Sequence, residues 1–182
     1  SVSGYIWIGT DNGLYRYDGS EFTLFSLDGD EDATKYSINC IYLTSDEKLY
    51  VGTDNYGLYM YDNGTFQRVS EMYNLGVSTI NAMYEDDNKN LWIAASSGIF
   101  RLSSDGAEAL ADDVVSGLSV GNISGHGDYV YAIANNDILI TVDPERHVSI
   151  TNKSEYRVDD INSLYVDENG NRYYGSAGYS IL

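Results

Sequence analysis

The sequence predicts an all-β chain that folds as blades of a β-propeller, in an incomplete arc of about four to five antiparallel four-stranded sheets. A pattern at residues 5–18 (YIWIGTDNGLYRYD) returns at 49–62 (LYVGTDNYGLYMYD), and weaker copies stand at 91–102 and 130–140. Asparagines recur with the same spacing of about forty residues, at Asn39, Asn81, Asn122 and Asn162. No stretch of helical length has an apolar period near 3.6, which is the period of a helix.

The second repeat contains the strands expected of one blade. Strands a to d are predicted at about 38–43, 49–53, 57–61 and 65–69. The segments between them are rich in Ser, Asp, Asn and Gly, which accept positive φ or hydrogen-bond their own backbone. Each blade is therefore expected to be an antiparallel meander of four strands.

The whole chain, 1–182, is expected to be a single propeller segment. Its expected parts are 1–37 (partial blade, strands b to d), 38–79, 80–120 and 121–160 (full blades) and 161–182 (partial blade, strands a to c). Since strands b and c are expected at both ends, the arc is not expected to close on itself. Open edges and faces are unfavourable in isolation. We therefore expect packing against the remaining blades of a longer propeller, or self-association through exposed blade faces.

Aromatic residues recur at equivalent blade positions. The chain has 18 tyrosines, and Trp7 and Trp92 occupy matching positions of strand b. Blades pack face to face, so these side chains are interpreted as core rather than as ligand platforms. The single cysteine, Cys40, cannot form an internal disulfide and is expected to act as a small core residue.

The charge of the chain excludes several partners. Ten basic and 28 acidic residues give a formal net charge of −18. This charge repels nucleic acid and anionic membrane surfaces, so no nucleic-acid partner is expected. No run approaches the roughly 18 apolar residues that cross a bilayer, so no membrane insertion by this segment is expected.

Two strings carry a family resemblance: residues 5–19, followed by Phe22, and residues 80–93. They closely resemble the two-component regulator propeller repeat. The resemblance implies the extracytoplasmic (periplasmic or cell-surface) sensor part of a bacterial membrane signalling receptor, upstream of a histidine kinase or diguanylate cyclase module. It further implies that this part senses carbohydrate, with an oligosaccharide as ligand and the signalling modules of the parent protein as partners.

A ligand is expected at the rim formed by the b–c turns and the d–a connections, because rim loops are the usual place for function. Carboxylates and amides bind adjacent sugar hydroxyls, and Tyr36, Tyr56 or Tyr73 would supply a ring face. The predicted ligand-binding residues are Asp11, Asn12, Asp54, Asn55, Tyr56, Tyr73, Asn135 and Asn136. The alternative is that Asp-Asn-Gly segments serve only as turns. Tyr56 is an insertion relative to the first repeat, which turn geometry does not demand.

The repeated asparagines have two interpretations. They line a polar channel, or each side chain bonds the backbone of the connection before it. The second interpretation explains the repetition without a ligand, and the sequence favours it.

The sequence predicts no enzyme, no catalytic residue, no metal site and no cofactor. His126 and His147 have no neighbours that indicate a metal pair or a nucleophile. The acidic run 28–32 lacks the glycine and the closing glutamate of a calcium loop. Two hypotheses of function remain: a ligand-sensing module, and a structural or protein-docking propeller without a small-molecule ligand.

Overall fold

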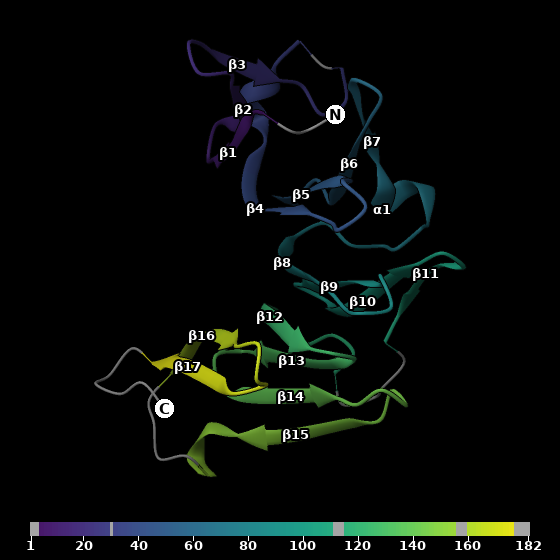
Figure 1. Cartoon of the computed structure of the whole chain (residues 1–182), viewed down its shortest axis with the longest axis vertical. Helices are drawn as coiled ribbons and strands as arrows, with labels where there is room; N and C mark the ends of the chain where they lie inside the picture. The colour runs from purple at the N-terminus through teal and green to yellow at the C-terminus, as the bar shows by residue number, and fades with distance from the viewer. Residues whose placement is uncertain (1–3, 30, 111–114, 156–159, 177–182) are drawn as a thin grey trace. The chain divides into compact units, whose positions relative to one another are not determined.

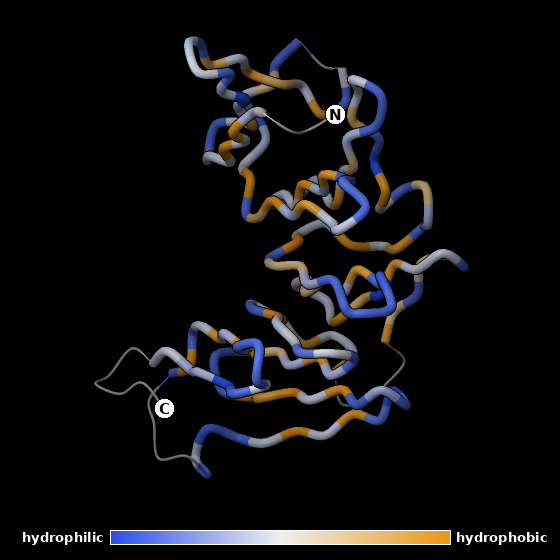
Figure 2. Tube along the Cα trace, viewed as in Figure 1, coloured by the Kyte–Doolittle hydropathy of each residue, from blue (hydrophilic) through white to orange (hydrophobic). Residues whose placement is uncertain are grey.

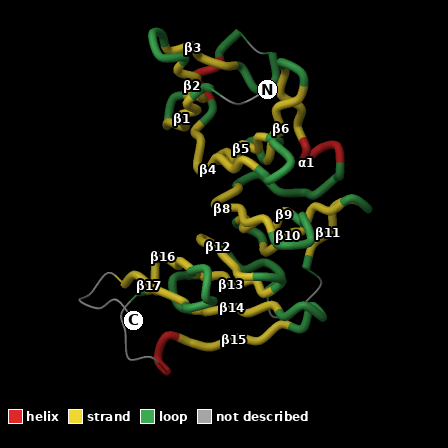
Figure 3. Tube along the Cα trace, viewed as in Figure 1, coloured by secondary structure: helices red, strands yellow, loops and turns green. Residues whose placement is uncertain are grey.

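The computed structural model describes residues 4–29, 31–110, 115–155 and 160–176 (Figure 1). The chain divides into two compact units, Ser1–Ala82 and Met83–Leu182, and the division falls inside strand β8 (Ile80–Glu85). Each unit is a set of antiparallel sheets, and short turns join the strands within each sheet, as the strand and loop colouring of Figure 3 shows.

The first unit contains a three-stranded sheet and a four-stranded sheet, each in sequential strand order. Their strands are β1 (Ile6–Thr10), β2 (Gly13–Tyr17) and β3 (Phe22–Phe25), then β4 (Ser37–Leu43), β5 (Leu49–Asp54), β6 (Leu58–Asp62) and β7 (Thr65–Arg68). A 3-10 turn, η1 (Ala33–Lys35), precedes β4, and a short helix, α1 (Val69–Met72), follows β7.

The remaining strands form two four-stranded sheets and one two-stranded sheet, again in sequential order. They are β8 with β9 (Leu91–Ala95), β10 (Gly98–Ser103) and β11 (Gly106–Ala109), then β12 (Val120–His126), β13 (Tyr129–Ala134), β14 (Ile138–Val142) and β15 (Val148–Asn152), and finally β16 (Ile161–Val166) with β17 (Arg172–Ser176). A 3-10 turn, η2 (Lys153–Glu155), follows β15.

The predicted fold class, all-β with antiparallel four-stranded sheets, is confirmed. Each end of the strands expected in the second repeat lies within one residue of the observed β4 to β7, including the end of strand d. Val69 was expected in that strand but begins α1, where it is buried. No helix in the described part of the chain is long and apolar enough to cross a bilayer.

Glycines in strand b allow neighbouring strands to pack closely. A Cβ on Gly9 would lie 2.5 Å from Cγ2 of Ile38, and one on Gly52 would lie 2.7 Å from Cγ2 of Ile80. Strand β1 packs on β4 in the same way that β9 packs on β12. The strand b residue of one sheet thus lies against the strand a residue of the next, which explains why a side chain is excluded at the repeated glycine.

Each unit has its own apolar core, and Figure 2 shows apolar residues concentrated in the strands. In the first unit the core contains Leu14, Leu27, Tyr36, Ile38, Val51 and Tyr59, with Trp7 packed against it. In the second, Ile133 and Leu139 pack with Ile161, Leu164 and Val166. Cys40 is free, and burial raises the pKa of its thiol to about 12, which keeps it protonated and unreactive.

Two of the repeated asparagines, Asn39 and Asn162, lie at a register shift in strand a. Pairing of β4 with β5 shifts register between Ile38 and Cys40, which places Asn39 in a bulge. The Asn39 side chain donates through Nδ2 to the backbone oxygen of Ile80 at 3.1 Å. The prediction that Asn39 caps the connection before it is therefore wrong. It ties strand a of its own sheet to the beginning of the next one.

Candidate functional site

The turn between β1 and β2 carries Asp11 and Asn12, both exposed. The Thr10 hydroxyl accepts from the Asn12 backbone N–H at 3.1 Å and donates to the Gly13 carbonyl at 2.9 Å. Thr10 therefore satisfies the turn backbone, while the Asp11 and Asn12 side chains make no hydrogen bond within the described residues. Both are available to a ligand at this turn.

The corresponding turn of the next sheet carries Asp54, Asn55 and Tyr56. Here the Thr53 hydroxyl donates to the Gly57 carbonyl at 2.8 Å and accepts from the Tyr56 N–H at 3.2 Å. Asn55 has φ 74°, in the left-handed region that asparagine tolerates. Turn geometry therefore accounts for Asn55 without any ligand.

Asp54 also has a structural partner. Its Oδ1 accepts from the Thr79 hydroxyl at 3.2 Å, which ties the turn to the segment before β8. The side chain is half-buried. Of the paired Asp-Asn turns, the one at Asp11 leaves more polar groups open to a ligand.

The inserted Tyr56 belongs to an aromatic and basic cluster. Its ring meets that of Tyr36 edge to face, with centroids 4.9 Å apart, and the Lys35 ammonium lies 5.4 Å from its ring centroid. Arg68 donates from Nε to the Tyr56 carbonyl at 2.7 Å. Tyr56 keeps partial exposure, but Tyr36 is completely buried. Tyr36 therefore cannot present a ring face to a sugar, contrary to expectation.

Sequence reasoning missed the role of Asp28 in this cluster. Its Oδ2 accepts from the hydroxyl of Tyr36 at 3.0 Å and from that of Tyr59 at 2.9 Å. Burial of Tyr59, together with its hydrogen bond to Asp28, raises the pKa of that phenol well above its ordinary value. Both phenols therefore donate to one carboxylate. The separation along the chain, 8 and 31 residues, gave no local signal of it.

The other predicted residues lie apart from this cluster in the contacts described. Tyr73 follows α1 and is 40% exposed. Within the described residues, no hydrogen bond or ring contact joins it to Asp54, Asn55 or Tyr56. Tyr73 is an exposed ring at the end of α1, a helix that packs on β6 through the bond from the Leu58 N–H to the Ser70 hydroxyl.

Asn135 and Asn136 form the turn between β13 and β14, in the second unit. Both have left-handed φ, 52° and 56°, as a tight hairpin turn requires. The Asn135 N–H donates to the Ser119 carbonyl at 2.9 Å, and the Asn136 carbonyl accepts from the Ile161 N–H at 3.0 Å. Their backbones are committed to structure, while both side chains are exposed.

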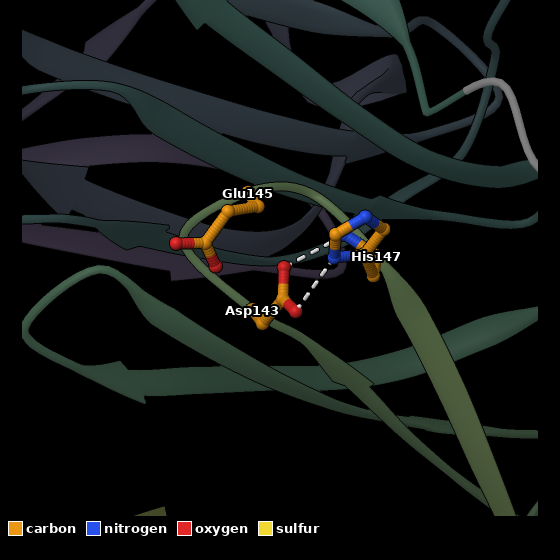
Figure 4. A group of neighbouring side chains, drawn as sticks. All are labelled: Asp143, Glu145 and His147. Atoms are coloured by element: carbon orange, nitrogen blue, oxygen red, sulfur yellow. Dashed lines mark hydrogen bonds and ion pairs between the residues drawn. The ribbon is translucent and has the colours of Figure 1, made fainter.

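A group with metal-ligand chemistry occurs in the β14–β15 turn (Figure 4). Ligand atoms of Asp143, Glu145 and His147 lie within 4.8 Å of one another. However, Asp143 already accepts the His147 N–H at 2.8 Å, and its Oδ2 lies 3.0 Å from Nδ1 of His147. Desolvation acts to raise the pKa of Asp143, but the hydrogen bonds from His147 outweigh it and hold the pKa below its usual value.

The same capping arrangement recurs in turns that have no histidine. Asp86 accepts from the N–H of Asn90 at 2.9 Å, and Asp167 accepts from that of Asn171 at 2.8 Å. Each bond spans four residues, as at Asp143. The geometry of the Asp143 group is therefore explained by turn capping.

Comparison with known proteins identifies the repeat. A family model described as "two component regulator propeller" matches residues 74–97. This segment is a two-component regulator propeller repeat. The resemblance seen in the sequence is thus confirmed, and the match covers the end of the connection before β8 together with β8 and β9. No curated protein matches the chain.

Solved structures share the fold. The chain is similar to the extracellular domain of a protein assigned as a hybrid two component system from B. thetaiotaomicron (TM-score 0.75, 18% identity, 96% of this chain, 25% of that one). It is also similar to the extracellular domain of one assigned as a one component system from the same organism (TM-score 0.74, 24% identity, 96% and 27%). A third is virginiamycin B lyase from Staphylococcus aureus (TM-score 0.71, 15% identity, 97% and 61%).

At these identities the likeness shows the propeller fold alone. The chain spans about a quarter of the length of the two B. thetaiotaomicron domains. Since extracellular domains of component systems and a lyase share this fold, the fold by itself does not indicate an activity.

Proposed function

We propose that this chain is part of a non-enzymatic, ligand-sensing propeller in the extracytoplasmic part of a bacterial membrane signalling receptor, and that its ligand is a carbohydrate. The observation that carries the proposal is the match of residues 74–97 to the two-component regulator propeller repeat. The likeness to extracellular domains of bacterial signalling proteins supports the same assignment. The remaining blades and the signalling modules would then belong to the parent protein.

The β1–β2 and β5–β6 turns support a polyhydroxylated ligand. Exposed Asp11 and Asn12 offer a carboxylate and an amide without hydrogen-bond partners in the described part of the chain. Tyr56 offers a partly exposed ring, held by Tyr36 and by the bond from Arg68 to its carbonyl. Asp54, Asn55 and Tyr73 stay in the proposed set of the first unit as secondary contacts, and Asn135 and Asn136, on a turn of the second unit, are proposed as a separate ligand contact. A rigid ring and adjacent polar groups are what sugar recognition needs.

The test is binding of the full chain to a panel of neutral oligosaccharides, measured by isothermal titration calorimetry. We expect at least one neutral oligosaccharide to bind, and Tyr56→Ala and Asp11→Ala each to weaken it by about tenfold, or ~1.4 kcal/mol. Tyr165→Ala, at a tyrosine that is 63% exposed and far from these turns in sequence, is the matched control and should bind normally. A panel without any response would refute carbohydrate sensing by these turns.

A protein-docking role is the second candidate, and the β1–β3 sheet favours it. The register places Ile6 opposite Tyr17 and Tyr17 opposite Phe22, so the three share one face. Ile6 and Phe22 are 60% and 63% exposed. Light scattering over a range of concentrations tests self-association through this face. A molar mass that rises with protein concentration, and that no longer rises in Phe22→Ser, would favour docking over sensing.

A further inference from the structure

A row of three side chains crosses the β9–β10–β11 part of the third sheet. The register pairs Trp92 with Arg101 and Arg101 with Glu108. Directly paired residues of antiparallel strands project from the same face. The indole, the guanidinium and the carboxylate therefore stand in line on one side of the sheet.

A second arginine reaches this row from the next sheet. Arg146 lies in the β14–β15 turn and donates from Nη1 to Oε1 of Glu108 at 2.5 Å. Arg101 contacts the same oxygen from Nη2 at 2.8 Å and from Nε at 3.1 Å. Two guanidinium groups thus converge on one carboxylate oxygen, and the group keeps a net positive charge.

The two arginines have donors to spare. A guanidinium carries five N–H donors. In the described part of the chain Arg101 uses Nε and Nη2, and Arg146 uses Nη1, all toward Glu108. The side chain of Arg146 is half exposed, at 50%, whereas that of Arg101 is 23% exposed. The remaining N–H groups are available to donate to an anion.

A cavity of about 240 Å³ opens at this point, lined by Trp92, Arg101, Glu108, Ala109, Leu110 and Arg146. Its wall therefore combines apolar surface with two cationic side chains. The volume falls below the roughly 300–1,000 Å³ typical of drug-sized ligands. It suits a small ligand, such as one sugar ring or a short organic acid.

From this geometry we infer that the cavity binds the carboxylate of a uronic-acid sugar. The carboxylate receives charge-assisted hydrogen bonds from Arg101 and Arg146, and the sugar ring lies against Ala109 and Leu110, with Trp92, which is 3% exposed, forming the buried floor of the cavity. The choice of a sugar rests on the proposed function. The paired guanidinium groups alone indicate a carboxylate. Because the chain carries a net charge of −18, long-range attraction does not help an anion, and the short-range bonds must supply the affinity.

The first sheet provides a matched control. Arg16 pairs with Trp7 as Arg101 pairs with Trp92, but the residue opposite Arg16 on β3 is Thr23, not a carboxylate. Arg16→Gln therefore removes the same charge from the same strand position without touching the cavity.

The experiment measures binding of glucuronate and galacturonate to the full chain by NMR titration, with glucose, galactose and acetate as comparison ligands. We expect the uronates to bind and both Arg101→Gln and Arg146→Gln to weaken them by about tenfold or more. Arg16→Gln should leave binding unchanged. Arg146→Gln, in an exposed turn, keeps the test valid if Arg101→Gln destabilises the sheet.

Several outcomes would overturn the inference. Uronates that do not bind, or that bind equally well to Arg146→Gln, would refute it, and acetate binding as tightly as the uronates would refute the sugar. If neutral oligosaccharides bind through Tyr56 while uronates do not, only the cavity proposal fails. If uronates bind through Arg146 while no neutral oligosaccharide binds, the cavity proposal holds and the turn site of the proposed function fails.

Discussion

The first and third sheets each place a tryptophan opposite an arginine, but the polar groups of these side chains have different partners in the two sheets. Trp7 lies opposite Arg16, and Trp92 lies opposite Arg101. In the third sheet the Trp92 indole donates from Nε1 to Oδ2 of Asp86 at 2.8 Å. In the first sheet the Trp7 Nε1 is buried without a hydrogen-bond partner among the described residues.

The arginines differ in the same way. Arg101 is paired with a carboxylate, Glu108. The Arg16 guanidinium instead lies over two rings, 4.2 Å from the centroid of Tyr5 and 4.9 Å from that of Phe25, and its buried Nε has no partner in the described part of the chain. The repeat therefore specifies which side chains form the row. The neighbouring residues decide whether the tryptophan and arginine of each sheet have polar or aromatic partners.

The largest expected effect is the loss of the Asp86 carboxylate. Asp86→Ala should lower the free energy of unfolding by about 3 kcal/mol, because the buried Trp92 N–H and the Asn90 amide lose their acceptor. Urea denaturation measures it. Asp87→Ala, at the exposed neighbour, is the control and should change stability by less than about 0.5 kcal/mol. If Asp86→Ala lowers the free energy of unfolding by less than about 1 kcal/mol, the Asp86 carboxylate does not stabilise Trp92 and Asn90 as expected.

A smaller effect distinguishes the two tryptophans directly. Trp92→Phe and Trp7→Phe make the same chemical change, but only the first breaks a hydrogen bond to a buried carboxylate, and Trp92 is also the more deeply buried of the two. We expect Trp92→Phe to cost about 1–2 kcal/mol more than Trp7→Phe. Equal losses in urea denaturation would show that the two rows are energetically the same.

The smallest effect concerns the turns that follow the two arginine strands, and it depends on pH. In the first sheet, Asp18 accepts the backbone N–H groups of Glu21 at 2.9 Å and Ser20 at 2.8 Å, and these bonds lower its pKa from 3.8 to about 2. Since the pKa is depressed on folding, the stabilisation is fully present above about pH 4 and is lost as the pH falls toward 2. The stability difference between the wild type and Asp18→Ser should vanish over that range.

The matching turn of the third sheet provides the comparison for that titration. Its cap is Ser103, whose hydroxyl donates to the Gly106 carbonyl and accepts the Asp105 N–H. A hydroxyl does not titrate here, so the effect of Ser103→Ala should be the same at pH 2 and pH 7. Thermal unfolding across this range measures both variants. A pH-independent effect at Asp18 would contradict the capping role of its carboxylate.

Much of the fold was predictable because the signals are local. Strand alternation and turn residues placed β4 to β7 within one residue, although Val69, expected at the end of strand d, begins α1. The error at Val69 has a physical cause: its burial is satisfied in either conformation, so its apolar character does not choose between them. The Asn39 bond was also mispredicted, because its acceptor, Ile80, lies in the next repeat.

The candidate site was less predictable. The Asp-Asn turns were found from composition, since Asp, Asn and Gly are the residues that such turns need. Asp28 was not found as a partner of Tyr59, nor Glu108 as a partner of Arg146. These pairs are 31 and 38 residues apart, and no local pattern links them.

The sequence by itself determined the repeat, the order of strands and the chemistry of the turns, because these depend on neighbours a few residues apart. The tertiary structure alone decided which polar groups from distant parts of the chain meet: Asp28 with the Tyr59 phenol, and Arg146 with Glu108. The physical reason is that hydrogen bonds act over about 3 Å. Such contacts form only after the strands have packed.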